Sequence, residues 1–224
     1  MRNDLFTVVP MKRVPVDLNE LRGPDSIERV ASRWLEDDTT QKIREELAKA
    51  TEENRQRFLR AKFLYHRTSR VDQVQKILAD SRIRLREELK SYSKGGPDLK
   101  HASLTTDIRN TTGGAILIVF HAKSLETKNH LVPVSYALPQ DRVPDDAQHV
   151  WSTPDFVDEW EVAAVGGLNF GAEDIAAVIM DKSYWYRYVL TPGDKAAWTK
   201  EQKKAEAVGI QIAMDESLIN RFRN

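Results

Sequence analysis

The stretch that most constrains the fold of this chain is residues 63–69, Phe-Leu-Tyr-His-Arg-Thr-Ser, because it joins a short apolar run directly to a helical pattern. Apolar side chains then recur with helical spacing, which predicts a helix over 70–79 with Ser69 as its N-cap. His66 and Thr68 would therefore lie at a strand end beside the helix N-terminus. Backbone N–H groups converge at such a point, which favours a site for a polar ligand.

Two later segments carry polar side chains on strand-like patterns. The sequence His-Ala-Ser-Leu-Thr-Thr at 101–106 predicts a strand with Ser103 and Thr105 on one face. The sequence Asp-Glu-Trp-Glu-Val-Ala-Ala-Val then puts Glu159 and Glu161 on one face as another strand begins. Hydroxyl and carboxylate groups are thus expected on rigid strands rather than in loops.

Taken in order, Tyr-His-x-Thr with a following helix, Ser-Leu-Thr and Glu-x-Glu-Val resemble the three motifs of the ADP-ribosyltransferase superfamily. The likeness is strongest to divergent bacterial and phage members, and it covers residues 62–182. It implies an α+β fold with a mixed, mostly antiparallel split sheet of the ADP-ribosyltransferase type. It also implies NAD as the substrate of a glycosyltransferase-class reaction, in a toxin-like or phage-related setting.

The resemblance assigns catalysis to the third motif. Its glutamate corresponds to Glu161. Cleavage of the bond between nicotinamide and ribose develops positive charge on the ribose, and a carboxylate on a rigid strand can stabilise that charge while holding a ribose hydroxyl. Glu159 matches the first carboxylate of the Glu-x-Glu variant, which in relatives that modify arginine positions or deprotonates the acceptor. The alternative is two solvated acids at a strand start.

The first two motifs are expected to bind NAD. His66 resembles a histidine whose ring bonds a ribose hydroxyl. Relatives often have glycine next, whereas this chain has Arg67, whose guanidinium could instead reach the pyrophosphate. Thr68 belongs to the same stretch, or only caps the helix. Ser103 matches a serine that holds the catalytic glutamate or supports the nicotinamide pocket, and Thr105 shares its face. The alternatives are a histidine bonded to a carbonyl and ordinary strand hydroxyls.

Composition excludes several other kinds of site. Lysine plus arginine and aspartate plus glutamate both number 34, so the formal net charge is zero. A balanced charge argues against strong non-specific binding of nucleic acid, although a local basic groove stays open. The chain has no cysteine, which excludes disulfides, thiolate zinc sites and a cysteine nucleophile. The histidines lack metal-ligand spacing, so no metal site is expected.

The sequence also predicts no association with a membrane. The N-terminus lacks the apolar run of a signal peptide, and no window approaches the roughly 20 apolar residues of a membrane span. The longest apolar stretch, residues 115–120, has the length of a strand. A cytoplasmic protein is therefore expected.

Three segments are expected along the chain: a helical N-terminal extension at 1–61, an ADP-ribosyltransferase-like α+β domain at 62–192, and a C-terminal helical tail at 193–224. The extension could pack on the domain or bind a protein partner. The predicted strands lie at 62–66, 82–86, 101–105, 114–121, 131–136, 161–165 and 175–180.

Several functions remain open at this point. The enzyme could modify a protein side chain or a nucleic acid, or hydrolyse NAD. A non-catalytic phage, prophage or immunity protein could instead retain the fold as a structural or protein-binding module. An NAD-using RNA phosphotransferase would need more basic residues than the motifs contain. DNA-modifying toxins of the superfamily share the His-x-Thr start but differ around the third motif.

Overall fold

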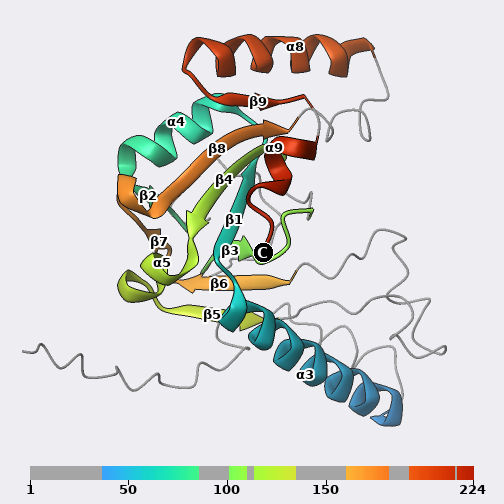
Figure 1. Ribbon diagram of the computed structural model, residues 1–224. Coiled ribbons are helices and arrows are strands. Elements are labelled where there is room, and N and C mark those ends of the chain that lie inside the picture. Colours follow the sequence, from blue (N-terminus) through green and yellow to red (C-terminus); the bar gives the residue numbers. More distant parts are fainter. Residues whose placement is uncertain (1–36, 86–100, 110–113, 135–159, 182–191, 215) are drawn as a thin grey trace, which may run out of the picture.

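A seven-strand sheet forms the centre of the molecule (Figure 1). The computed structural model describes residues 37–85, 101–109, 114–134, 160–181, 192–214 and 216–224. The strand order is β5-β6-β3-β1-β4-β8-β9, and every neighbouring pair is antiparallel except β8 and β9. The bounds are β1 (Phe63–Thr68), β3 (His101–Thr105), β4 (Ile116–His121), β5 (Leu131–Val134), β6 (Glu161–Val165), β8 (Ile175–Asp181) and β9 (Gln211–Ala213). The expected α+β class with a mixed, mostly antiparallel sheet is confirmed.

Helices pack on both faces of this sheet, and a second, two-stranded sheet lies beside it. The helices of the described residues are α3 (Asp37–Arg60), α4 (Val71–Asp80), α5 (Ala122–Lys128), α8 (Pro192–Ala207) and α9 (Glu216–Asn220), and a 3-10 turn covers Ala172–Asp174. The small sheet pairs β2 (Arg82–Ile83) with β7 (Leu168–Asn169). None of these described helices combines the length and the apolar character that crossing a membrane requires.

The apolar core is divided by the sheet into two parts. One part packs α4 and α5 against alternate residues of β1 and β4, such as Leu64 and Ile118. The other part packs α9 against the intervening residues, such as Tyr65 and Leu117. This division follows from strand geometry, because successive side chains point to opposite faces. A polar residue on β1 therefore faces either the α4 and α5 side or the α9 side of the sheet, depending on whether its number is even or odd.

The positions of two strands in the sheet agree with their residue types. The apolar run at β4 has β1 on one side and β8 on the other, and Ile116 to Phe120 are fully buried. A central strand buried on both faces reads as continuous apolar sequence. β5, which contains Pro133, lies at the edge of the sheet. Proline lacks an N–H group, so an edge position suits it.

The predicted junction between β1 and the helix is partly wrong. β1 continues to Thr68, because Arg67 and Thr68 pair with β4. The helix therefore starts later, at Val71, and its N-cap is Arg70, whose side chain makes no capping hydrogen bond. The Val71 N–H instead donates to the Glu201 carboxylate of α8, 2.9 Å away. A distant side chain thus caps α4 in place of Ser69.

The predicted C-terminal helical tail also contains a strand that sequence patterning misses. Helices α8 and α9 make up most of this tail, but β9 between them pairs in parallel with β8. A three-residue strand is too short to show alternation, so only its pairing reveals it. The sheet of the predicted 62–192 domain therefore continues into the residues beyond 192.

The ladder between β1 and β3 is limited to one register pair, and the stretch of the two strands without ladder pairing is called the opening below. β1 pairs with β4 along its whole length, from Phe63 to Thr68. With β3 it shares a single register pair, Tyr65 with Thr105. Beyond this pair the ladder does not continue, and the hydrogen bond between His66 Nδ1 and the Ser103 carbonyl connects the two strands instead. The polar residues of the first motif, His66 to Thr68, lie on the part of β1 that has no ladder pairing with β3.

Several predictions lie outside the described residues. They are the part of the N-terminal extension over 1–36, the last two residues (135–136) of one predicted strand, and Glu159.

Candidate active site

The three sequence motifs lie on adjacent strands. β3 carries Ser-Leu-Thr and lies between β1, which carries Tyr-His-Arg-Thr, and β6, which begins with Glu161. The segments are about 40 and 60 residues apart in sequence, so only the sheet brings them together.

Register decides which of these side chains share a face. Residues directly opposite one another in an antiparallel pair point to the same side. Tyr65 lies opposite Thr105, and Thr105 lies opposite Glu161. Ser103, Thr105 and Glu161 are therefore on one face of the sheet, whereas His66, next to Tyr65, is on the other. The predicted catalytic carboxylate and second-motif hydroxyls are brought together on one face, whereas the His66 side chain is not on that face and contacts only the backbone carbonyl of Ser103 among the predicted site residues.

The carboxylate of Glu161 is held by a histidine. His101 Nε2 lies 2.9 Å from Glu161 Oε1, and the two side chains are 0% and 7% exposed. The imidazole nitrogen donates this hydrogen bond when it carries the proton. The bond fixes one carboxylate oxygen, so Glu161 has a defined orientation at the start of β6.

His101 was not among the site residues predicted from the sequence. The strand pattern of β3 could have indicated it, because His101, Ser103 and Thr105 are alternate residues of one strand and so share a face. What the sequence lacked was the pairing of β3 with β6, which brings the imidazole within reach of Glu161. Among the described residues, no cluster of His, Asp and Glu could hold a metal ion.

His66 bridges the opening in the sheet. Its Nδ1 lies 2.9 Å from the backbone carbonyl oxygen of Ser103. A carbonyl oxygen can only accept, so Nδ1 carries the proton. Burial lowers the pKa of His66, and the bond to the Ser103 carbonyl opposes this to a lesser extent. The neutral ring therefore presents Nε2 as a hydrogen-bond acceptor.

Thr68 and Arg67 have partners of different kinds. Thr68 is buried, and its hydroxyl donates to Gln73 Oε1, 2.6 Å away in α4. Arg67 points to the opposite face from His66, and its guanidinium is 2% exposed. It donates to the carbonyl oxygens of Ile108 (2.8 Å) and Gly114 (3.3 Å) and to the Asp181 carboxylate (3.3 Å). In this arrangement Arg67 is not brought together with His66.

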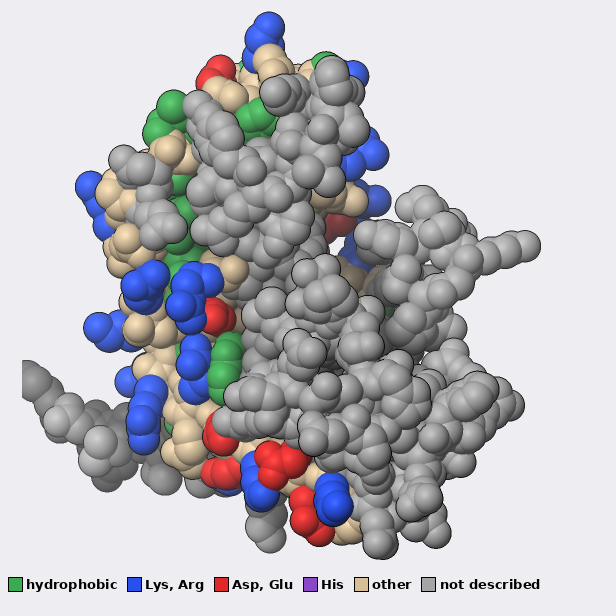
Figure 2. All heavy atoms as spheres, turned by 90° about the vertical axis from the view of Figure 1, so that its right-hand side faces the viewer, with side chains coloured by type: hydrophobic (Ala, Val, Ile, Leu, Met, Phe, Trp, Pro, Cys, Tyr) green, Lys and Arg blue, Asp and Glu red, His purple; other side chains and the backbone are tan. Residues whose placement is uncertain are grey.

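The face of the molecule seen in Figure 2 carries charges of both signs, and on its described part Lys and Arg side chains lie close to Asp and Glu side chains. Asp107, just after β3, pairs with Arg109 at 3.1 Å, and hydrogen bonds from Arg109 keep the pKa of Asp107 low despite its burial. A large field of a single sign, typical of non-specific polyanion binding, is therefore not developed by the described residues on this face.

The arrangement holds a positioned carboxylate, Glu161, on one face of the sheet and a neutral imidazole acceptor, His66, on the other face, two strands away. Comparison of the chain with protein-family models, with curated proteins and with solved structures finds no match.

Proposed function

We propose that this protein is an NAD-dependent ADP-ribosyltransferase-like enzyme. The observation that carries the proposal is the sheet order β6-β3-β1, with His66 in the opening between β1 and β3 and Glu161 at the start of β6. The opened sheet also supports the finer expectation of a split sheet of the ADP-ribosyltransferase type. The ordered motifs, on neighbouring strands, are consistent with a single dinucleotide site.

In the proposed reaction the bond between the ribose C1′ carbon and the nicotinamide nitrogen breaks. The nicotinamide leaves with the bonding electron pair, so positive charge develops on the ribose. An acceptor oxygen or nitrogen, or water, then bonds to C1′ and loses its proton. Glu161 has the properties of the stabilising carboxylate, because one oxygen is held by His101 and the other can hold a ribose hydroxyl near the developing charge.

The role proposed for His66 follows from its tautomer. With Nδ1–H donated to the Ser103 carbonyl, Nε2 can accept a hydrogen bond from a hydroxyl of NAD. Its lowered pKa keeps the ring neutral, so the acceptor is available near neutral pH. The Ser103 side chain is exposed on the other face of the sheet, the face of Glu161.

Release of fluorescence from etheno-NAD tests this proposal. The wild-type chain is expected to cleave the analogue, and Glu161→Gln should reduce the rate by about 10²-fold or more, because one electrostatic contact to the transition state is lost. Glu173→Gln, an exposed acid paired with Lys128, is a matched control that should retain the wild-type rate. Equal rates for Glu161→Gln and the wild type would reject this site.

The acceptor needs a separate experiment. Incubation with NAD and candidate proteins or nucleic acids, followed by mass spectrometry, should show the mass of one ADP-ribose unit on the true acceptor. Cleavage of NAD without any modified macromolecule would assign water as the acceptor.

A second candidate function is supported by the burial of Glu161. A carboxylate that is 7% exposed and bonded to a histidine could serve only to stabilise β3 against β6. The chain would then be a non-catalytic protein, such as a phage, prophage or immunity component, that uses the fold to bind another protein. Calorimetry separates the two, because a chain without a dinucleotide site produces no binding heat with NAD.

A further inference from the structure

Helix α3, from the N-terminal extension, contacts the first residue of β6 through a buried amide. Asn54 is fully buried, and its Nδ2 donates to the backbone carbonyl oxygens of Glu161 (2.6 Å) and Val134 (2.8 Å). These carbonyls belong to the start of β6 and the end of β5, which are paired with each other. One side chain of α3 therefore ties together the two strands at the position of Glu161.

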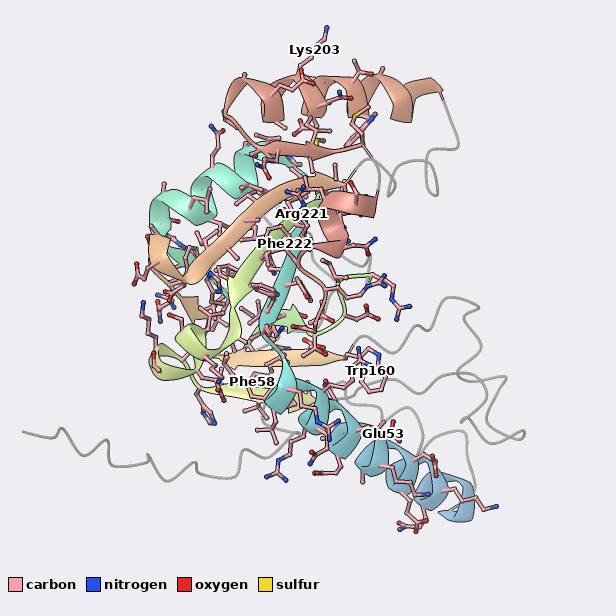
Figure 3. All side chains as sticks on the ribbon, in the orientation of Figure 1. Glu53, Phe58, Trp160, Lys203, Arg221 and Phe222 are labelled. Atoms are coloured by element: carbon pink, nitrogen blue, oxygen red, sulfur yellow. The ribbon has the colours of Figure 1, made fainter. Side chains whose placement is uncertain are left out.

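The same face of α3 also contacts the residue before Glu161. Arg57 is three residues after Asn54, on the same side of the helix, and its guanidinium lies 4.3 Å from the centre of the Trp160 ring. Figure 3 shows Trp160 beside α3. Trp160 has a φ of 43°, in the left-handed region, and its carbonyl accepts from Thr106 N–H at 3.1 Å. Trp160 therefore has an unfavourable backbone conformation immediately before β6 begins. Its contacts with Arg57 and Thr106 maintain this conformation.

The oxygen atom of the Asn54 amide also bears on the role of this residue. Its Oδ1 is buried and accepts no hydrogen bond from the residues that the structure describes. Turning the amide over would aim oxygen at two carbonyl oxygens, so the present orientation is the one that the strands require. A buried acceptor without a partner costs stability. An apolar side chain would avoid that cost but could not grip the two carbonyls.

We propose that Asn54 and Arg57 make α3 a positioning element for Glu161. Asn54 holds the backbone of Glu161, Arg57 holds the ring of Trp160, and His101 orients the carboxylate from the other side. The N-terminal extension is thus part of the catalytic unit and not only a covering or a partner-binding segment. This inference rests on the proposed function, because it assigns Asn54 and Arg57 a role in NAD cleavage through Glu161.

The test compares Asn54→Ala, Asn54→Asp and Arg57→Ala with the wild type in the full chain. Gln56→Ala is the matched control, because Gln56 is exposed on the same helical turn and bonds only Glu52 among the described residues. Three quantities are measured well below the melting temperature: kcat for etheno-NAD cleavage, the Kd for NAD, and amide hydrogen exchange over residues 161–165. Arg57→Ala is an exposed substitution, so it keeps the test valid if an Asn54 variant fails to fold.

A positioning role predicts a fall in kcat of about tenfold to 10²-fold for Asn54→Asp, with a Kd for NAD close to that of the wild type, since small displacements of a reacting group have such effects. Arg57→Ala should lower kcat several-fold, and both should accelerate exchange over 161–165 while β4 exchange is unchanged. A merely structural role would lower the melting temperature and leave kcat at the control value, which would overturn the inference.

The same series separates failure of the inference from failure of the proposed function. If the wild type cleaves NAD, Glu161→Gln does not, and all three α3 variants retain wild-type kcat, the positioning role alone is rejected. If the wild type neither binds nor cleaves NAD, the proposed function is rejected and the positioning role with it. Unchanged hydrogen exchange in the variants would reject the mechanical link between α3 and β6 in either case.

Discussion

Replacing Arg67 with methionine should unfold the protein more readily instead of selectively weakening NAD binding. The guanidinium and the Asp181 carboxylate are 2% and 5% exposed, so both charges are buried. Methionine removes one charge and leaves the other in a poorly solvating environment. Breaking a buried pair from one side costs about 3–5 kcal/mol, a large part of a typical total stability of about 5–15 kcal/mol.

The structure also supplies a lower limit for this cost. Arg67 donates to the carbonyl oxygens of Ile108 and Gly114 in addition to Asp181. Each hydrogen bond from a charged donor contributes about 1.5–3 kcal/mol net, so even two of the three account for about 3 kcal/mol or more. The buried ion pair and the hydrogen bonds, considered separately, therefore give a similar loss of stability for Arg67→Met. The double variant Arg67→Met/Asp181→Leu should recover part of the loss, because no uncompensated charge remains buried.

Urea denaturation followed by circular dichroism measures the effect, with stability extrapolated linearly to water. Arg70→Ala is the matched control, since Arg70 and Asp72 form an exposed pair whose removal should leave the urea midpoint unchanged. A stability of Arg67→Met within about 1 kcal/mol of the wild type would refute a structural role. An Arg67→Lys variant that keeps full stability but loses NAD affinity would instead support the pyrophosphate role predicted from the sequence.

Three further predictions concern other parts of the fold. Gly114→Ala should cost about 2–6 kcal/mol in urea denaturation, because a Cβ there would overlap the backbone of residues 68–69 at a φ of 135°. Gly209→Ala, also at positive φ but in open space, should cost clearly less, and equal costs would contradict the overlap. His66 should make stability depend on pH. Its pKa is lowered on folding, so the unfolded chain binds more protons and the stability due to His66 is present above its ordinary pKa of 6.5 and lost below it. The urea midpoint should therefore fall on acidification more for the wild type than for His66→Gln, and parallel curves would count against this. Asn224→Ala should lower stability by about 1–2 kcal/mol, because its amide makes four hydrogen bonds to backbone groups at the start of β1 and after β3. A melting temperature equal to that of the wild type would disprove it.

Local patterning predicted most elements of the sheet. The continuous apolar run of β4 indicated a central strand, and Pro133 indicated an edge strand, because both signals come from the strand's own side chains and backbone donors. The strand β9 escaped prediction because three residues carry too little periodicity. The N-cap of α4 was predicted wrongly because its capping carboxylate, Glu201, is 130 residues away in sequence.

The candidate site was likewise predicted only in part from the sequence. The resemblance of the ordered motifs selected Glu161, Ser103 and Thr105, parity put Ser103 and Thr105 on one face of their strand, and register places all three on one face of the sheet. The partners of these residues could not be predicted from the sequence. His101 reaches Glu161 only because β3 and β6 pair, and Asn54 reaches its carbonyl only because α3 packs across their ends.

The sequence by itself determined the order of the elements, the motifs on β1, β3 and β6, and the balance of charge, since these depend on neighbouring residues and on composition. Only the tertiary structure decided that Arg67 faces Asp181 while His66 faces the opening, and that an N-terminal helix holds the start of β6. The physical reason is that strand alternation gives each residue a side but not a partner. Partners are chosen by register and packing between segments that are far apart in the chain.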